Sequence, residues 1–393
     1  MRLGLFLILL LLPLPTLAGD REPTPDDLKW GHWMMAYHAR KDVGSVPDFL
    51  AYLDQGTIWE WEKNDDSAHD ATITPRPGYT SCRYAMVMGF LAPIFAQNPD
   101  KVGGWLIDVL SEDTKRAAAL ALVAAGIEDK APPSYAALMA EAKADAPSLD
   151  VPALRACDLD MYWGATFASG DARYVDRILD VLDPASPRTG NDLYDMVMRR
   201  SAQWSLGSNM RYAVVERAVA QRREAATGDL RRALDEVWAA YEKNKAAARL
   251  PVHDGDFSAL LAIVDAREIA KAVEAPSYAG LGIRPLKTAR RGDVVTAHLI
   301  TSGMGLDDRF SADVTYSVRL LYPDGRVYGE FKDIEATRGG PIVRRFDAWS
   351  ARGHLDIEFV PDDPLGTYTA EVIVRDNVSG KALTLTNAID LVE

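Results

Sequence analysis

The chain has 393 residues, too many for one ordinary hydrophobic core, and this length indicates two or three domains. Apolar residues make up 48% of the sequence, which is ample material for well-packed cores. The formal net charge of -13 disfavours nucleic acid as a partner, because nucleic-acid binding requires a basic surface, and it also disfavours a general attraction to anionic lipid.

The first residues, MRLGLFLILLLLPLPTLAGD, have the pattern of a cleavable signal peptide. An arginine precedes an apolar run, and Thr16-Leu17-Ala18 supplies small residues for cleavage after Ala18. The run is too short, and its two prolines too disruptive, for a membrane-spanning helix. We therefore expect a signal peptide over residues 1–18, no transmembrane segment after its cleavage, and a location in the periplasm or outside the cell. The composition, rich in alanine, arginine and aspartate, is typical of a bacterial protein.

Residues 19–274 are predicted to form a helical domain, because apolar residues recur at three- and four-residue spacing. A polar stretch at 57–79 interrupts this pattern and is predicted to be an irregular insertion. Near the end of this domain, His253 to Asp256 are predicted to form a loop, and Asp256 is predicted to be the N-cap of a final helix.

The helical region contains an internal repeat. The segment FASGDARYVDRILDVL (167–182) aligns without gaps on FAQNPDKVGGWLIDVL (95–110), and WMMAYHARKDVGSVPDFLAYLD (33–54) is a fainter third copy. Each copy is predicted to be a helix, a tight turn and a second helix, whose apolar stripe is buried only when copies stack. The sequence therefore predicts a helical-repeat, α-solenoid-like domain; chance similarity between amphipathic helix pairs is the alternative.

Cys82 and Cys157 are the only cysteines. The repeat places both near the start of corresponding helices, which pack side by side, and an exported protein meets an oxidising environment. We expect a disulfide between them, with two buried free thiols as the alternative.

Residues 275–393 are predicted to form a β-sandwich domain, because short alternating segments are separated by turn residues such as Pro323-Asp324-Gly325. The stretch DDPLGTYTAEVIVRDNVSGKALTL (362–385) resembles the closing strands of bacterial immunoglobulin-like domains. Within it, Asp363, Gly366 and Tyr368 resemble the tyrosine corner of that fold, in which the tyrosine hydroxyl bonds to nearby backbone. This resemblance implies a fold and no activity.

The helical part in turn resembles a type of exported, poorly characterised bacterial protein. That type has tandem copies of an aromatic–small–Gly-Asp turn followed by V-x-x-I-L-x-x-L. The matching residues here are Trp163, Phe167, Gly170, Asp171, Val175, Ile178, Leu179 and Leu182. The resemblance implies organisation and little about function.

Motifs for catalysis or metal binding are weak. His32 and His38 are six residues apart and do not form the i, i+4 pair of a helical zinc site. His69 lies in an acidic stretch that permits a divalent cation, although a solvated loop explains it better. Glu60 and Glu62 alternate with tryptophans, a pattern that permits a glycan site but favours an amphipathic packing element. No metal or cofactor is predicted.

The sequence favours a binding or assembly protein of the bacterial envelope that recognises another envelope or exported protein. The candidate binding residues line a groove of the helical repeat in one interpretation and form its core in the other: Trp33, Tyr37, Trp163, Phe167, Trp204 and Asn209. An enzyme acting on envelope polysaccharide or peptidoglycan, with Glu60 and Glu62 as its acids, is one alternative. A periplasmic neutraliser of an exported toxin is another. Oligomeric state is not predicted.

Overall fold

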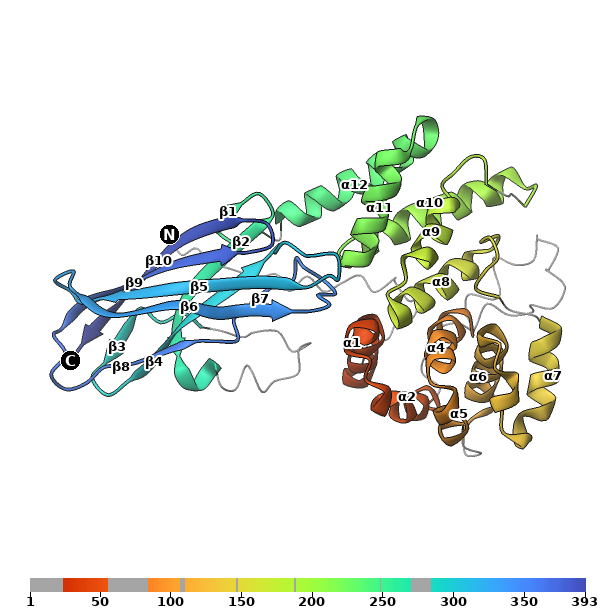
Figure 1. Cartoon of the computed structure of the whole chain (residues 1–393), viewed down its shortest axis with the longest axis horizontal. Helices are drawn as coiled ribbons and strands as arrows, with labels where there is room; N and C mark the ends of the chain where they lie inside the picture. Colours follow the sequence, from red (N-terminus) through yellow and green to blue (C-terminus); the bar gives the residue numbers. More distant parts are fainter. Residues whose placement is uncertain are drawn as a thin grey trace. The chain divides into compact units, whose positions relative to one another are not determined.

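A computed structural model of the chain describes residues 24–55, 84–106, 110–145, 148–186, 189–247, 249–269 and 284–393. Helices occupy the first part of these residues and two β-sheets the second, which confirms the predicted order of an α region followed by a β region (Figure 1). The chain divides into two compact units. The first comprises residues up to 208 together with 222–234, and the second comprises 209–221 together with 235–393.

The helices among the described residues are α1 Pro25–Arg40, α2 Val46–Leu53, α4 Ala85–Gln97, α5 Pro99–Trp105, α6 Glu112–Ala125, α7 Ala136–Asp145, α8 Ala156–Ser169, α9 Ala172–Asp180, α10 Asp192–Asn209, α11 Ala213–Ala225 and α12 Gly228–Ala247. The pairs α1–α2, α4–α5 and α8–α9 coincide with the three copies that the sequence suggests. Helices α11 and α12 are each divided between the two units. The end of α11 and the start of α12, within residues 222–234, belong to the first unit.

The turn between α8 and α9 explains why the FASGD stretch carries glycine and aspartate. Gly170 ends α8 in the left-handed conformation with φ 69°, and a Cβ there would also crowd the ring of His38. Asp171 then caps α9 by accepting a hydrogen bond from the backbone N–H of Arg173 at 3.0 Å. These two residues are therefore used to reverse the chain.

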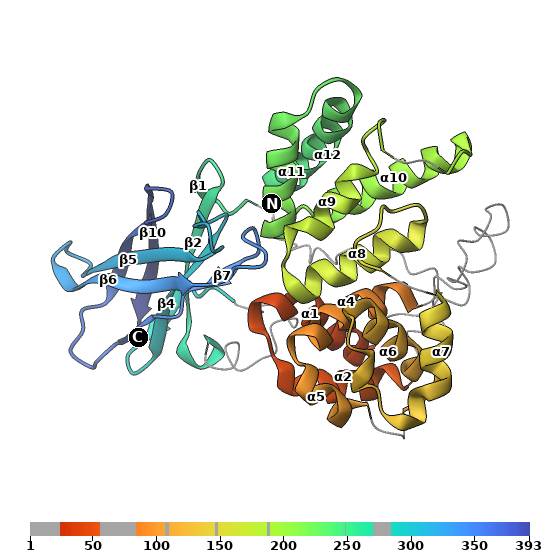
Figure 2. The same ribbon diagram turned by 45° about the vertical axis from the view of Figure 1, so that its right-hand side comes forward.

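The centre of the first unit is the close crossing of α4 and α8, which lie side by side (Figure 2). Gly89 of α4 faces the backbone of Met161, and Gly164 of α8 faces the backbone of Met86, so a Cβ at either glycine would overlap a carbonyl oxygen. Most residues of both helices are buried. The two glycines are what allows the helices to approach so closely.

The strands are β1 Val252–Asp254, β2 Phe257–Asp265, β3 Thr288–Arg290, β4 Val294–Ser302, β5 Ala312–Leu321, β6 Val327–Gly339, β7 Trp349–Ser350, β8 Leu355–Glu358, β9 Gly366–Asp376 and β10 Lys381–Val392. One sheet has the order β1-β2-β4-β7, with β8 also paired to β4, and the other has the order β3-β10-β9-β5-β6. All pairs are antiparallel except β3 with β10. Alternate residues of both sheets share one buried core, which is the arrangement of a sandwich.

The predicted tyrosine corner is present as a hydrogen bond. The Tyr368 hydroxyl, near the start of β9, donates to the backbone oxygen of Pro364 at 3.0 Å. The ring is fully buried and packs edge-on against Phe359, with 5.0 Å between ring centroids. The contact fixes the chain where it enters β9.

The prediction of a helix after Asp256 is wrong, because Phe257 to Asp265 form strand β2. The sequence FSALLAIVD lacks the alternation of a half-exposed strand, since β2 is buried on both faces, and such a run resembles a helical segment. Asp256 lies in the turn between β1 and β2 and is not an N-cap. Strands therefore begin at Val252, before the position 275 at which the sequence suggested them.

A network of charged side chains joins the helices to the sheets within the second unit. Arg345 binds Glu216 of α11 through two hydrogen bonds, of 2.7 and 2.9 Å, and contacts Asp256 at 3.0 Å. Lys245 of α12, which is almost fully buried, contacts the other carboxylate oxygen of Asp256 at 2.9 Å. Burial alone raises the pKa of Asp256, but Lys245 and Arg345 outweigh it and hold that pKa below its usual value.

Candidate functional site

Four of the six predicted binding residues belong to the core. Trp33, Tyr37, Trp163 and Phe167 are all buried, and they pack against one another in neighbouring pairs with ring centroids 5.1 and 5.9 Å apart. The sequence left open whether these side chains line a groove or form the core. The four belong to the core, because a buried ring offers no surface to a partner. Trp204 differs, since 52% of its surface is exposed.

The other residues predicted from the sequence do not provide an exposed binding surface among the described residues. Asn209 is half-buried at the end of α10, and Cys157 is buried in α8. Glu60, Glu62, His69 and Cys82 lie outside the described residues, so the acidic site and the disulfide stay predictions. Within the described part of the chain, no group of histidine, cysteine and carboxylate side chains is arranged to hold a metal ion.

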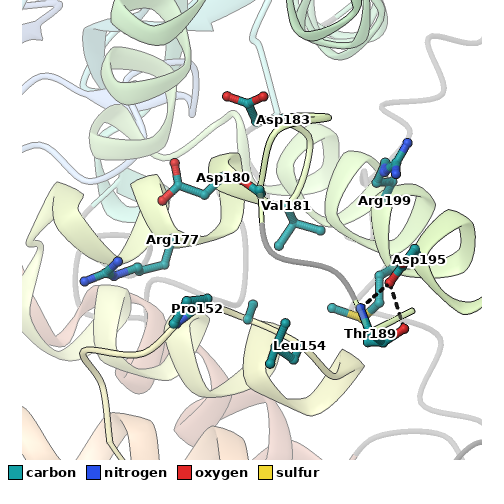
Figure 3. Close-up of a pocket in the computed structure, with 12 residues that line it drawn as sticks. Pro152, Leu154, Arg177, Asp180, Val181, Asp183, Thr189, Asp195 and Arg199 are labelled. Carbon is teal, nitrogen blue, oxygen red and sulfur yellow. Dashed lines mark hydrogen bonds between the residues drawn. The ribbon is translucent and has the colours of Figure 1, made fainter. Parts of the chain in front are cut away.

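One pocket of about 190 Å³ lies in the first unit, among the chain before α8, the end of α9 and the start of α10 (Figure 3). Its lining is rich in charge and comprises Pro152, Ala153, Leu154, Arg177, Asp180, Val181, Asp183, Ser186, Thr189, Asp195, Met198 and Arg199. The mixture of acids and arginines makes it the first place to look for chemistry.

Most of these charged groups already have structural partners. Asp180 pairs with Arg222 of α11, and Arg177 donates to the backbone oxygen of Asp150 at 3.3 Å. Asp195 is buried and accepts two hydrogen bonds from Thr189, one from its N–H at 3.1 Å and one from its hydroxyl at 2.9 Å (Figure 3). The lining includes neither histidine nor cysteine, and the one hydroxyl shown bonded to a carboxylate, that of Thr189, belongs to the turn that Asp195 holds. The arrangement serves to hold the start of α10 in place.

A serine–histidine pair in the β region offers a second place for chemistry. The Ser350 hydroxyl lies 2.7 Å from Nε2 of His298, while Nδ1 of His298 has no hydrogen-bond partner among the described residues. Burial, with a smaller contribution from His354, lowers the pKa of His298 to about 4. An imidazole with that pKa and no carboxylate to orient it is a poor general base at neutral pH.

Helix α10 presents an exposed apolar surface. Asn191, the residue before the helix, accepts a hydrogen bond from the N–H of Tyr194 through its side-chain oxygen at 3.2 Å. One face, with Met198, Ala202 and Leu206 at four-residue spacing, is buried. The opposite face carries large apolar side chains that are between 41% and 67% exposed: Leu193, Met196, Val197 and Trp204. We call these four residues the α10 stripe.

The α10 stripe is the strongest candidate for a functional surface. Single exposed apolar residues are common on proteins, whereas several on one helix face mark a site of interaction. Sequence reasoning selected Trp204 and missed the other three. The signal was available, because apolar residues recur around the whole circumference of this helix, more than one buried face requires.

The sequence matches no protein-family model and no curated protein. Two solved structures are distantly similar. One is a family 123 glycoside hydrolase from Clostridium perfringens, with 12% identity, 35% of this chain and 28% of that chain covered, and a TM-score of 0.20. The other is the alkylpurine DNA glycosylase AlkC of Pseudomonas fluorescens, bound to DNA with an abasic site analog, with 12% identity, 78% of each chain covered and a TM-score of 0.21.

TM-scores this low do not establish a shared fold or function. The matched part also spans little more than a quarter of the hydrolase. The helices of the described residues include none that combines the length and the apolar character needed to cross a membrane.

Proposed function

We propose that this chain is an exported protein of the bacterial envelope that binds another envelope or exported protein through its helical region, with the α10 stripe as the contact surface. The single observation that supports this most is the exposure of four large apolar side chains on one face of α10. Burying such a face removes apolar surface from water and drives association.

Two features favour binding over catalysis. The charged groups of the pocket are largely paired with neighbouring protein groups, and the Ser350–His298 pair has a base of low pKa. The β region, with its resemblance to immunoglobulin-like domains, is assigned an accessory role in the same binding protein. Export through the signal peptide of residues 1–18 is part of the proposal.

Trp204 is the residue to test first, because tryptophans dominate the free energy of many protein interfaces. Replacing Trp204 with alanine is expected to weaken partner binding by about 2 kcal/mol, or about thirtyfold in Kd. Half of the ring is exposed already, so the stability of the free protein changes little.

The assay is co-purification of partners by the mature protein from envelope extracts, followed by titration of the enriched partner. Val327→Ala is the matched control, since Val327 on β6 is also 52% exposed but lies far along the chain from α10. We expect the control to retain the partner that Trp204→Ala loses. Equal recovery by both variants, or no specific partner for the unaltered protein, contradicts the proposal.

A further inference from the structure

Asp195, in the first turn of α10, uses only one of its two carboxylate oxygens. Oδ1 accepts both hydrogen bonds from Thr189, at 3.1 and 2.9 Å, whereas Oδ2 has no hydrogen-bond partner among the described residues. The residue is 7% exposed and lines the pocket of the first unit (Figure 3). A buried carboxylate oxygen without a donor is costly, so Oδ2 is suited to accept an N–H from a ligand.

Arg199, one turn further along α10, lines the same pocket. It is half-buried and makes no hydrogen bond or ion pair within the described part of the chain. An aspartate and an arginine four residues apart on a helix lie on the same face and within reach of each other, yet Oδ2 of Asp195 is unpaired here. Each side chain therefore retains the capacity to bind a group of opposite charge.

The other charged groups of the lining do not give the pocket a strong net charge. Asp180 is paired with Arg222 of α11. Arg177 and Asp183 contribute one charge of each sign, and each has one hydrogen bond to the backbone, Arg177 to the oxygen of Asp150 and Asp183 to the N–H of Ala185. The pocket thus attracts neither a purely cationic nor a purely anionic ligand through its overall charge.

The size and the apolar part of the lining limit what enters. A volume of about 190 Å³ corresponds to about six water molecules and is below the range of drug-sized pockets, so the ligand is small. Apolar side chains also line the pocket and favour a short apolar group on the ligand: Pro152, Ala153, Leu154, Val181 and Met198.

We infer that this pocket binds a free α-amino acid with an apolar side chain, whose ammonium donates to Oδ2 of Asp195 and whose carboxylate accepts from Arg199. A cation alone would leave Arg199 unmatched, and an anion alone would leave Oδ2 of Asp195 without a donor. The two groups of an α-amino acid share one carbon, and the two side chains start about 5–6 Å apart on one helix face. Charge-assisted hydrogen bonds form at both ends of the ligand.

Calorimetric titration of the purified protein with leucine tests this inference. Two analogues each lack one charged group of leucine: isoamylamine has no carboxylate, and isocaproate has no ammonium. We expect saturable binding of leucine and binding of each analogue that is weaker by about tenfold or more, because each leaves one side chain of the pocket unmatched. Glycine, which has both charges but no side chain, is also expected to bind more weakly than leucine.

Two variants test the assigned residues. Asp195→Asn removes the charge but keeps a carbonyl oxygen to accept the hydrogen bonds of Thr189, and Arg199→Gln removes the guanidinium. Each is expected to weaken leucine binding by about tenfold or more. Arg200→Gln is the matched control, because Arg200 is an exposed arginine of the same helix that is not part of the pocket lining. Circular dichroism of each variant checks its folding.

The outcomes decide the inference without reference to the α10 stripe. Leucine binding that Asp195→Asn and Arg199→Gln weaken and Arg200→Gln retains supports it. The inference is overturned by the absence of saturable leucine binding, by an analogue that binds as tightly as leucine, or by unchanged affinity in Asp195→Asn or Arg199→Gln. Trp204→Ala is expected to retain leucine binding, because Trp204 does not line the pocket.

Discussion

Replacing His298 with glutamine is expected to remove most of an acid-dependent loss of stability from the β region. His298 lies on β4 and is 1% exposed, with its Nε2 against the Ser350 hydroxyl. Burial, together with the nearby His354, lowers its pKa to about 4 from an ordinary value of 6.5. The folded protein therefore holds this imidazole neutral at pH values where the unfolded chain protonates it.

The sign of the effect follows from proton binding. Between about pH 6.5 and pH 4 the unfolded chain binds more protons than the folded protein, so the free energy of unfolding falls as the pH is lowered through this range. The interval between the two pKa values corresponds to a loss of about 3 kcal/mol, complete near pH 4. Above about pH 6.5 both states are neutral at this position and the contribution is constant.

Amide hydrogen exchange of the peptide that covers β4, 294–302, measures the effect in the full chain, after correction for the intrinsic exchange rate at each pH. We expect protection in the unaltered protein to decrease more steeply toward low pH than in His298→Gln, which does not titrate. His354→Gln is the control, because His354 is exposed to solvent and contributes only the smaller part of the shift. Equal pH slopes for the unaltered protein and His298→Gln would refute the reasoning.

Three further predictions concern stability. Gly164→Ala is expected to destabilise the protein by about 3 kcal/mol in urea denaturation, because the added Cβ overlaps the backbone of α4. Gly103→Ala in α5 is the control. It has open space around it and is expected to be neutral or slightly stabilising. Lys245→Met removes a buried cation from the half-buried carboxylate of Asp256 and is expected to cost about 3 kcal/mol in the free energy of unfolding. An unchanged denaturation midpoint would show that the Lys245–Asp256 pair is not stabilising. Cys157→Ser is expected to cost about 4 kcal/mol if the predicted disulfide forms, and alkylation of two thiols in the non-reduced, exported protein would exclude that bond.

The order of the two regions and most strands follow from local patterns in the sequence. Strands β5, β9 and β10 have alternating side chains and turn residues between them, and β9 begins and ends where the pattern indicates. Alternation is visible in a sequence because one face of each strand meets the core and the other meets solvent. Strand β2 was missed because both of its faces are buried, so that its sequence carries no such alternation.

The candidate site depended on the tertiary structure. The sequence singled out aromatic residues at helical spacing, but periodicity reports which residues share a face and says nothing about whether another element covers that face. Neighbouring helices bury Trp33 and Trp163, while Trp204 of α10 stays exposed. The sequence by itself determined the order of an α region and a β region, most of the strands and the set of aromatic candidates. Only the packing of the helices decided which of these side chains are able to meet a partner, because exposure depends on residues distant in the chain.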